Sequence, residues 1–330
     1  MRQICSIRLE KSILRKIIKT LIPLLIGILF IYFSISNTTQ EDRHTIYTSI
    51  KDAHYGYIFL SLVLGLLSHF SRAYRWNFML NPMGYHPRLI NNILAIFITY
   101  IANLGVPRSG EFFRATVLQT YENIPFEKSF GTIIAERTID LLMLSLTIGL
   151  ALTLESDLIY SLLEEKAINP YNVLAILLVC SLGVYFLVKQ LKKSTHPLAQ
   201  KINGLLKGLA EGFLTIIKMK KKWAYLFHTL FIWVMYIAMF YIIKFSLPET
   251  QGLGFEALLI GFIVGALAIS TTNGGIGIYP FSVSLVLISY GISKESSLAF
   301  GWIMWTAQTV MVILFGSLSF FLVPLINRKK

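Results

Sequence analysis

Long apolar runs constrain this chain more than any other feature of its sequence. A helix needs about 20 consecutive apolar residues to cross the hydrocarbon core of a bilayer. Such runs recur along a chain that is 55% hydrophobic and only 14% charged. We predict membrane-spanning helices at residues 17–36, 57–80, 130–154, 171–188, 223–245 and 298–325. Residues 1–330 are therefore expected to form a single all-α polytopic membrane domain.

The net charge of +13 is concentrated in three basic blocks of the sequence. They are residues 2–19, the lysine-rich stretch 189–222, and the last three residues, 328–330. Because loops rich in Lys and Arg face the cytoplasm, we expect both termini there. Anionic lipid head groups, rather than nucleic acid, are the expected partners. Within the second block, apolar residues at three- and four-residue steps predict an amphipathic helix over 198–218 on the inner leaflet.

Two further apolar runs are interrupted by glycine and are too short to cross the membrane on each side of the break. The first ends at Asn103-Leu104-Gly105-Val106-Pro107, and a second short helix follows the break. Proline removes a backbone donor and glycine permits a sharp reversal, so residues 89–120 are predicted to form a re-entrant helical hairpin. The stretch A-I-S-T-T-N-G-G-I-G-I-Y-P predicts a second hairpin over residues 257–290.

The charged loops predict that the two hairpins enter the membrane from opposite sides. The first half would run span, hairpin from inside, span, and the second half would run span, hairpin from outside, span. This is an inverted repeat, an arrangement that places substrate sites near the bilayer midplane in many transporters.

Charged residues lie within or against the apolar runs near the first break. They are Arg108, Glu111, Arg114, Glu136, Arg137 and Asp140. A charge in lipid costs roughly 2.5–3.5 kcal/mol on insertion scales, so these residues predict a polar site. Arg72 and Arg75 lie three apart on one helix face, either as part of this site or as anchors that reach the interface. The arginines outnumber the acids, which favours an anionic head group, although a structural ion-pair network would use the same residues.

The second break supplies further candidate substrate-binding residues. They are Asn273, Gly274, Gly275 and Gly277, together with Asn103 at the first break and Gln308 on the last span. Glycines at the break either expose backbone groups to a head group or let helices pack closely. The two cysteines and the scattered histidines indicate neither a disulfide framework nor a metal site, and we expect no cofactor.

The strings P-R-S-G-E-F-F-R, E-R-T-I-D and N-G-G-I-G resemble the transmembrane family of lysylphosphatidylglycerol synthases. The resemblance covers roughly residues 15–325. It implies a bacterial inner-membrane or archaeal protein with two re-entrant segments, associated with lipid translocation between leaflets. By motif match, the six charged residues from Arg108 to Asp140 carry over as the polar core. Since the chain stops at Lys330, the soluble aminoacyl-transferase domain of the full-length synthases, and with it lysyl transfer, is expected to be absent.

These observations predict a flippase-like translocator of an anionic phospholipid or a polyprenyl-phosphate-linked lipid, and no enzyme. One alternative is an integral membrane enzyme that acts on a lipid-linked envelope substrate, with Glu111 or Asp140 as general base. Another is an assembly partner of an envelope-biosynthesis enzyme, in which the charges serve structure alone.

Overall fold

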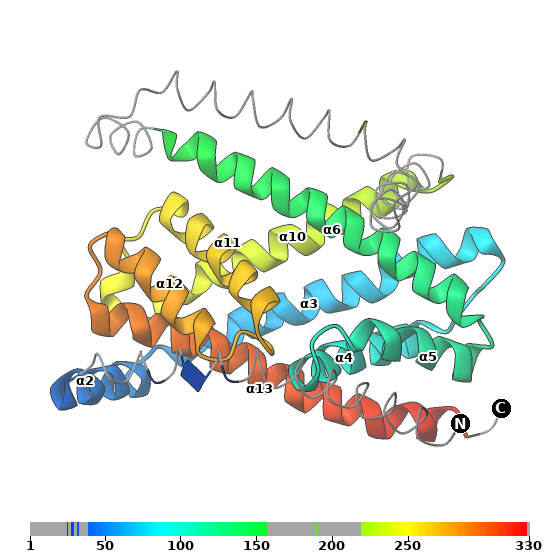
Figure 1. Cartoon of the computed structure of the whole chain (residues 1–330), viewed down its shortest axis with the longest axis horizontal. Coiled ribbons are helices and arrows are strands. Elements are labelled where there is room, and N and C mark those ends of the chain that lie inside the picture. The colour runs from blue at the N-terminus through cyan, green and yellow to red at the C-terminus, as the bar shows by residue number, and fades with distance from the viewer. Residues whose placement is uncertain are drawn as a thin grey trace, which may run out of the picture. The chain divides into compact units, whose positions relative to one another are not determined.

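A computed structural model describes residues 39–156 and 219–328 of the chain, with isolated positions before and between these ranges. The described residues form helices and no strands, as Figure 1 shows. The α-helices are α2 (Gln40–Lys51), α3 (Tyr55–Leu80), α4 (Leu89–Gly105), α5 (Gly110–Glu122), α6 (Phe126–Leu154), α10 (Lys222–Ile242), α11 (Phe255–Thr271), α12 (Ile278–Ser289) and α13 (Lys294–Ile326). The predicted spans 17–36 and 171–188 and the predicted amphipathic helix 198–218 lie outside the described residues.

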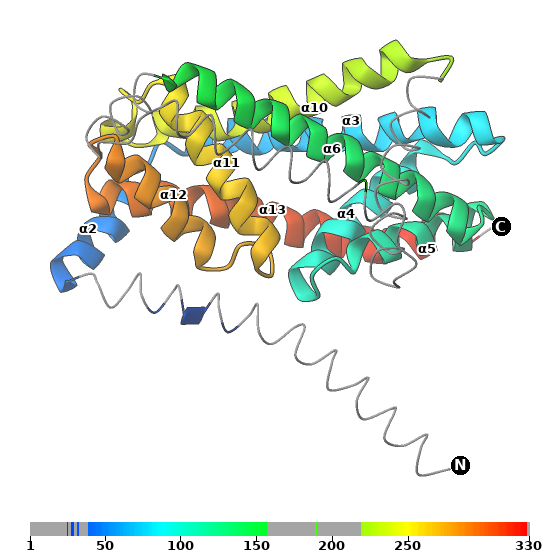
Figure 2. The same cartoon turned by 45° about the horizontal axis from the view of Figure 1, so that its top comes forward.

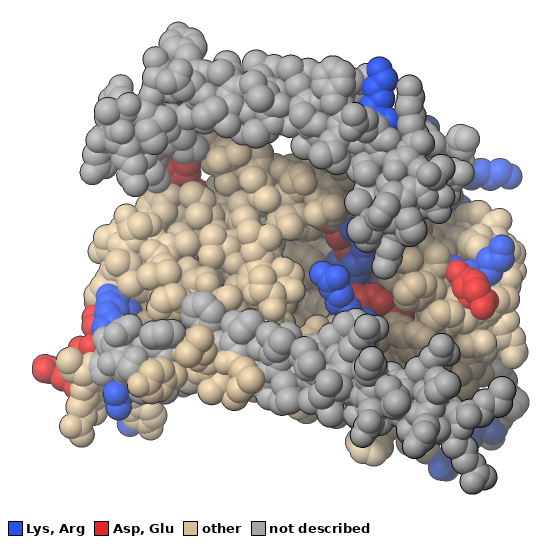
Figure 3. All heavy atoms as spheres, in the orientation of Figure 1, with Lys and Arg blue, Asp and Glu red and all other residues tan. Residues whose placement is uncertain are grey.

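Four of the helical segments are long and apolar enough to cross a membrane. They are Tyr55–Met83, Phe126–Leu154, Lys222–Ser246 and Lys294–Ile326. Each coincides with one of the spans predicted from the apolar runs. Large apolar side chains on their surfaces are mostly exposed, for example Phe59 at 69% and Phe321 at 72%. Charged side chains form only a few separate groups on the face drawn in Figure 3. The chain is a multi-pass, all-α membrane protein.

By its contacts the expected single domain divides into two compact units. One comprises Met1–Phe130 with Trp223–Lys330, and the other comprises Gly131–Lys222. The first unit therefore contains α3, α4, α5, α11, α12, α13 and nearly all of α10. The second contains α6 from its sixth residue onward.

Besides α2, the first unit has four short α-helices that form two helical hairpins, α4 with α5 and α11 with α12. In the first hairpin α4 ends at Gly105, and the chain passes through Arg108, whose φ of 61° lies in the left-handed region. The Asn103 side-chain carbonyl then accepts a hydrogen bond of 2.8 Å from the first backbone N–H of α5, that of Gly110. Asn103 thus satisfies one of the amide groups that every helix leaves unbonded at its N-terminus.

Each hairpin packs against a different half of α13, as Figures 1 and 2 both show. A Cβ atom on Gly301 would lie 2.7 Å from the backbone of Pro280 in α12, and one on Gly316 would lie 2.5 Å from Ile101 in α4. Glycine therefore permits the close approach of α13 to both hairpins.

The open ends of the two hairpins lie at opposite ends of α13. Glu122, at the end of α5, accepts hydrogen bonds from Arg88 and Asn91 at the start of α4, and Asn91 also contacts Asn327 just after α13. At the other end, Ser293 immediately before α13 donates to Glu249, 2.6 Å away. Polar contacts thus close the base of the first hairpin and fix the segment that leads into the second.

The tips of the hairpins meet. The Asn273 amide donates to the carbonyl oxygen of Gly105 over 3.3 Å, and a Cβ on Gly274 would lie 2.3 Å from the Leu104 side chain. The two hairpins therefore run in opposite directions along α13, as an inverted repeat requires. Their entry into a bilayer from opposite sides, and the inverted repeat as a whole, stay predictions.

Candidate functional site

Three arginines of the first unit are buried in the protein. Arg75 and Arg114 have no exposed surface, and Arg72 is 3% exposed. The alternative that Arg72 and Arg75 reach the membrane interface as anchors is therefore wrong. The reason lies in α10, which packs polar and aromatic side chains against this face of α3 and leaves the arginines no route to water.

Arg114 stacks on an aromatic ring. Its guanidinium carbon lies 3.8 Å from the centroid of the Trp76 ring, which is itself completely buried. A desolvated cation–π contact of this kind contributes about 2 kcal/mol or more. Trp76 therefore serves as the platform of a buried cation.

Arg75 and Arg72 contact α10 at successive turns. Arg75 donates a hydrogen bond of 2.8 Å to the Thr229 hydroxyl, and its guanidinium lies 5.1 Å from the Tyr225 ring. Arg72 lies 3.4 Å from the Tyr236 hydroxyl oxygen. These hydroxyl groups and ring faces orient the two guanidinium groups.

An aromatic cluster continues from Arg72 toward α4. The hydroxyl oxygens of Tyr236 and Tyr100 lie 3.3 Å apart, and the His69 ring lies 4.5 Å from that of Tyr100. The sequence analysis missed this cluster. The available signal was the helical spacing of Tyr225, Thr229 and Tyr236, which places three polar groups on one face of an apolar helix.

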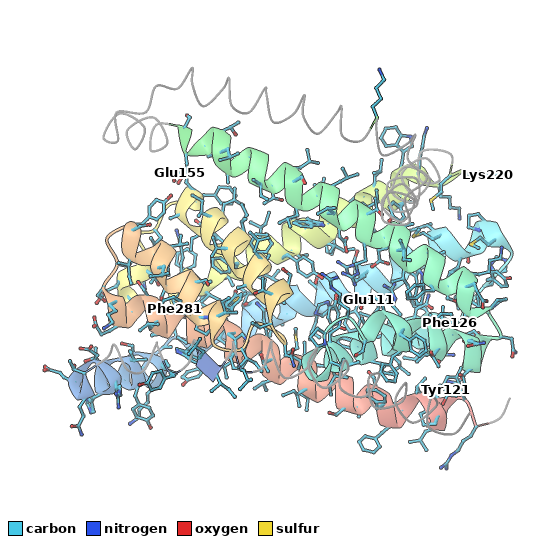
Figure 4. The ribbon with its side chains drawn as sticks, in the orientation of Figure 1. Glu111, Tyr121, Phe126, Glu155, Lys220 and Phe281 are labelled. Carbon is cyan, nitrogen blue, oxygen red and sulfur yellow. The ribbon has the colours of Figure 1, made fainter. Side chains whose placement is uncertain are left out.

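The first tip carries Arg108, just before α5, and Glu111, which Figure 4 shows at the start of α5. Arg108 is exposed and Glu111 is half-buried. Arg108 is thus exposed where Arg114 is buried, although the sequence grouped the two arginines in one site. A non-glycine residue in the left-handed region costs about 1–3 kcal/mol, and such strain is often found at functional sites.

The second tip is bound to α13 as well as to the first tip. The Trp305 indole donates a hydrogen bond of 2.8 Å to the carbonyl oxygen of Gly274. Gly274, Gly275 and Gly277 all have positive φ, so this turn requires the conformational freedom of glycine. Gln308, one turn beyond Trp305, is half-buried, and its side chain makes no hydrogen bond to the described residues.

The remaining predicted residues belong to α6 in the second unit. Glu136 is completely buried, and Arg137 forms an ion pair of 3.4 Å with Asp140 one turn later. The predicted contact between Arg137 and Asp140 on one helix face is therefore confirmed. Within the described ranges, no group of three or more His, Cys, Asp or Glu residues could hold a metal ion.

The first unit thus combines buried arginines with a pair of hairpin tips. Counting the predicted residues alone, it holds Arg72, Arg75, Arg108 and Arg114 against the single carboxylate of Glu111. A guanidinium group binds phosphate through two parallel hydrogen bonds, and its affinity for anions increases when water is excluded. This arrangement can bind an anion inside a membrane protein.

The comparisons with known proteins agree with the predicted resemblance. The family model described as "Lysylphosphatidylglycerol synthase TM region" matches residues 20–316, which include every candidate site residue. Over 128 residues, the chain is 30% identical to the "UPF0104 membrane protein MJ1595" of Methanocaldococcus jannaschii, covering 38% of this chain and 37% of that protein. Over 116 residues, it is 29% identical to the "Glycosyltransferase AglD" of Haloferax volcanii, covering 35% of this chain and 19% of that protein. No solved structure matches the chain.

Proposed function

Because the chain belongs to the transmembrane-region family of lysylphosphatidylglycerol synthases, we propose that it is a flippase-like translocator of an anionic lipid. The substrate would be a phospholipid or a polyprenyl-phosphate-linked lipid, moved between the leaflets of the cytoplasmic membrane. In this proposal the protein makes and breaks no covalent bond. Both chain termini would face the cytoplasm, beside the basic blocks of the sequence.

The burial of Arg72, Arg75 and Arg114 is the observation that carries the proposal. Charged side chains are costly to bury in a membrane protein, and intramembrane charges usually mark substrate pathways. Three guanidinium groups on two packed elements would offset the cost of bringing a phosphate out of the interface. The opposed hairpins supply short, irregular tips, which are common where transporters bind substrates.

The proposal is tested by a scramblase-type assay in liposomes of purified protein. A fluorescent phosphatidylglycerol is quenched from outside, so the extent of quenching reports exchange between leaflets. We expect Arg108→Gln and Arg114→Gln to reduce the rate at least tenfold, because each removes a cation from the path. Arg43→Gln, an exposed change on α2, is the matched control and should leave the rate unchanged.

Two outcomes separate function from folding. Arg114→Gln changes a buried residue and could fail to fold, so thermal unfolding in detergent is measured for each variant. Arg108 is exposed, and its variant is expected to fold normally. Wild-type transport rates in a well-folded Arg108→Gln and in a folded Arg114→Gln would refute the proposal.

A second candidate function comes from the name of one relative. The matched Haloferax volcanii protein is called a glycosyltransferase, although the match covers only 19% of it. This favours, as the alternative, a membrane enzyme or assembly partner that acts on a lipid-linked sugar. Glu111, half-buried at the start of α5, would then be the candidate general base. Turnover of a lipid-linked sugar by the purified protein, abolished by Glu111→Gln, would support the enzyme over the translocator.

A further inference from the structure

The tip of the second hairpin contains two buried polar atoms without partners. Thr272 and Asn273 are each only 3% exposed. The Thr272 hydroxyl and the Asn273 side-chain carbonyl oxygen make no hydrogen bond among the described residues. Buried polar groups in folded proteins are nearly always hydrogen-bonded, so a pair of adjacent exceptions requires an explanation.

The local backbone explains why Thr272 differs from the residues before it. The hydroxyls of Ser270 and Thr271 donate to carbonyl oxygens of their own helix, those of Leu267 and Ala268. Thr272 follows the end of α11 and has an extended backbone, with φ −129° and ψ 176°. Its hydroxyl is therefore carried away from the helix carbonyls and keeps both a donor and an acceptor free for a ligand.

The orientation of the Asn273 amide follows from its partner. The amide nitrogen lies 3.3 Å from the carbonyl oxygen of Gly105, which can only accept a hydrogen bond. The amide must therefore present N–H to Gly105, and its own oxygen is left as an acceptor. The tip thus offers an acceptor from Asn273 and a hydroxyl from Thr272 beside the first tip.

A hydroxyl group of a ligand complements this pair, because it can donate its one proton to the Asn273 oxygen and accept a hydrogen bond from the Thr272 hydroxyl. An ammonium group would also donate, but Arg108 lies three residues from Gly105 on the facing tip, and Arg114 lies one turn into α5 from Gly110. At 1.5 Å per residue, that turn is about 6 Å of helix. These two arginines outnumber Glu111, the one carboxylate between them, so the local charge favours a phosphate over an ammonium group.

We propose that Thr272 and Asn273 hydrogen-bond a hydroxyl group of the lipid head group, so that the site selects a phosphate-linked polyol or sugar. This inference rests on the proposed translocation of an anionic lipid and specifies its head group. The shared chemistry is a singly charged phosphodiester that carries at least one free hydroxyl. A glycerol head group on a phospholipid and a hexose on a polyprenyl phosphate both provide it.

The test is a lipid titration of the full chain in detergent micelles, followed by intrinsic tryptophan fluorescence. Phosphatidylglycerol and phosphatidylmethanol with the same acyl chains carry the same charge, and only the first has free hydroxyls. We expect phosphatidylglycerol to bind about three- to tenfold more tightly, the value of one or two hydrogen bonds. A polyprenyl-phosphate hexose is titrated in parallel, and the tighter of the two hydroxyl-bearing lipids identifies the source of the head group.

The decisive variant is Thr272→Val, which keeps the shape of the side chain and removes only the hydroxyl. The preference for phosphatidylglycerol should fall to within about twofold, while the affinity for phosphatidylmethanol is unchanged. The matched control is Ser297→Ala in α13, which removes another buried hydroxyl that has no hydrogen-bond partner in the described part of the chain. Both variants should be at least as stable as the wild type, because each loses an unsatisfied buried group. Only Thr272→Val should alter head-group selection.

Each failure has a separate meaning. Equal affinities of the wild type for phosphatidylglycerol and phosphatidylmethanol would refute recognition of the head-group hydroxyl. They would not contradict the proposed transport of an anionic lipid. An unchanged preference in Thr272→Val would assign its hydroxyl to packing or a bound water and refute the inference. Tighter binding of phosphatidylethanolamine than of phosphatidylglycerol would identify an ammonium group as the donor and would also refute the inference. No binding of any anionic lipid would refute the proposed function itself.

Discussion

Replacing Gly110 by alanine would add one methyl group where α5 touches α4. The new Cβ would lie 2.1 Å from the carbonyl oxygen of Thr99 and 2.7 Å from its carbonyl carbon. Ordinary contacts begin at 3.4 Å, so α5 would have to retreat by about 1 Å. No rotamer change can relieve this clash, because both Thr99 atoms belong to the backbone. The retreat would also pull the Gly110 N–H away from Asn103.

Two opposing effects set the magnitude of the change. Alanine is favoured over glycine within a helix by up to about 1 kcal/mol. Overpacking a well-packed contact typically costs about 1–3 kcal/mol, and a backbone clash lies at the upper end of this range. We therefore expect Gly110→Ala to lose about 1–2 kcal/mol of unfolding free energy and to melt at a lower temperature than the wild type.

Gly56→Ala is the matched control, because Gly56 also lies in the first turn of a helix, α3. A Cβ atom there would have no neighbour within 4 Å. This variant should melt at or slightly above the wild-type temperature, since only the helix preference acts. Thermal unfolding in detergent, followed by circular dichroism, measures both variants. If Gly110→Ala melts as high as Gly56→Ala, the close contact between α4 and α5 is refuted.

Three further predictions concern separate parts of the first unit. Hydrogen bonds from Thr39, the backbone N–H first, hold the pKa of Asp42 below its ordinary value of 3.8. The cap of α2 is therefore present above pH 3.8 and is lost as the pH falls through the lowered pKa. Amide hydrogen exchange in α2 should increase below the lowered pKa and not at about pH 6. Arg108→Gly should relieve the strain of the left-handed backbone at this position and raise the free energy of unfolding by about 1 kcal/mol. Lipid transport should fall at the same time. A loss of stability would refute the backbone strain. Glu122→Ala should cost about 1–2 kcal/mol, because it removes the acceptor of the Arg88 backbone N–H and one of the two acceptors of the buried Asn91 amide. An unchanged melting temperature would show that the base of the first hairpin closes without Glu122.

The apolar pattern and the breaks were sufficient to predict the described α-helices other than α2, which is polar and lies where the sequence indicated a loop. Runs of apolar residues must form helices in a bilayer, because no water is available for backbone groups. Gly105 and Pro107 end α4 where the sequence placed the first break, and the glycines from Gly274 onward take positive φ at the second. The pairing of Arg137 with Asp140 also followed from spacing, since residues three apart share a helix face.

The sequence could not rank the arginines by burial. Arg75 is enclosed by Thr229 and Tyr225, about 150 positions later in the chain, and no local sequence pattern predicts such a contact. Arg108 and Arg114 look alike in the motif, yet one is exposed on a turn and the other is stacked on Trp76. Their difference depends on the direction in which each side chain leaves the backbone and on what packs against it.

The sequence by itself determined the class of the protein, its family, the position of the helices and the presence of charge among apolar residues. These properties are local, because hydropathy, helix spacing and glycine conformation act within a few residues. The tertiary structure alone decided that three arginines are buried, that the hairpin tips meet through Asn273 and Gly105, and that the Thr272 hydroxyl has no hydrogen-bond partner among the residues that the structure describes. Those properties depend on contacts between segments distant in sequence, where packing fixes which polar groups find partners and which are left for a ligand.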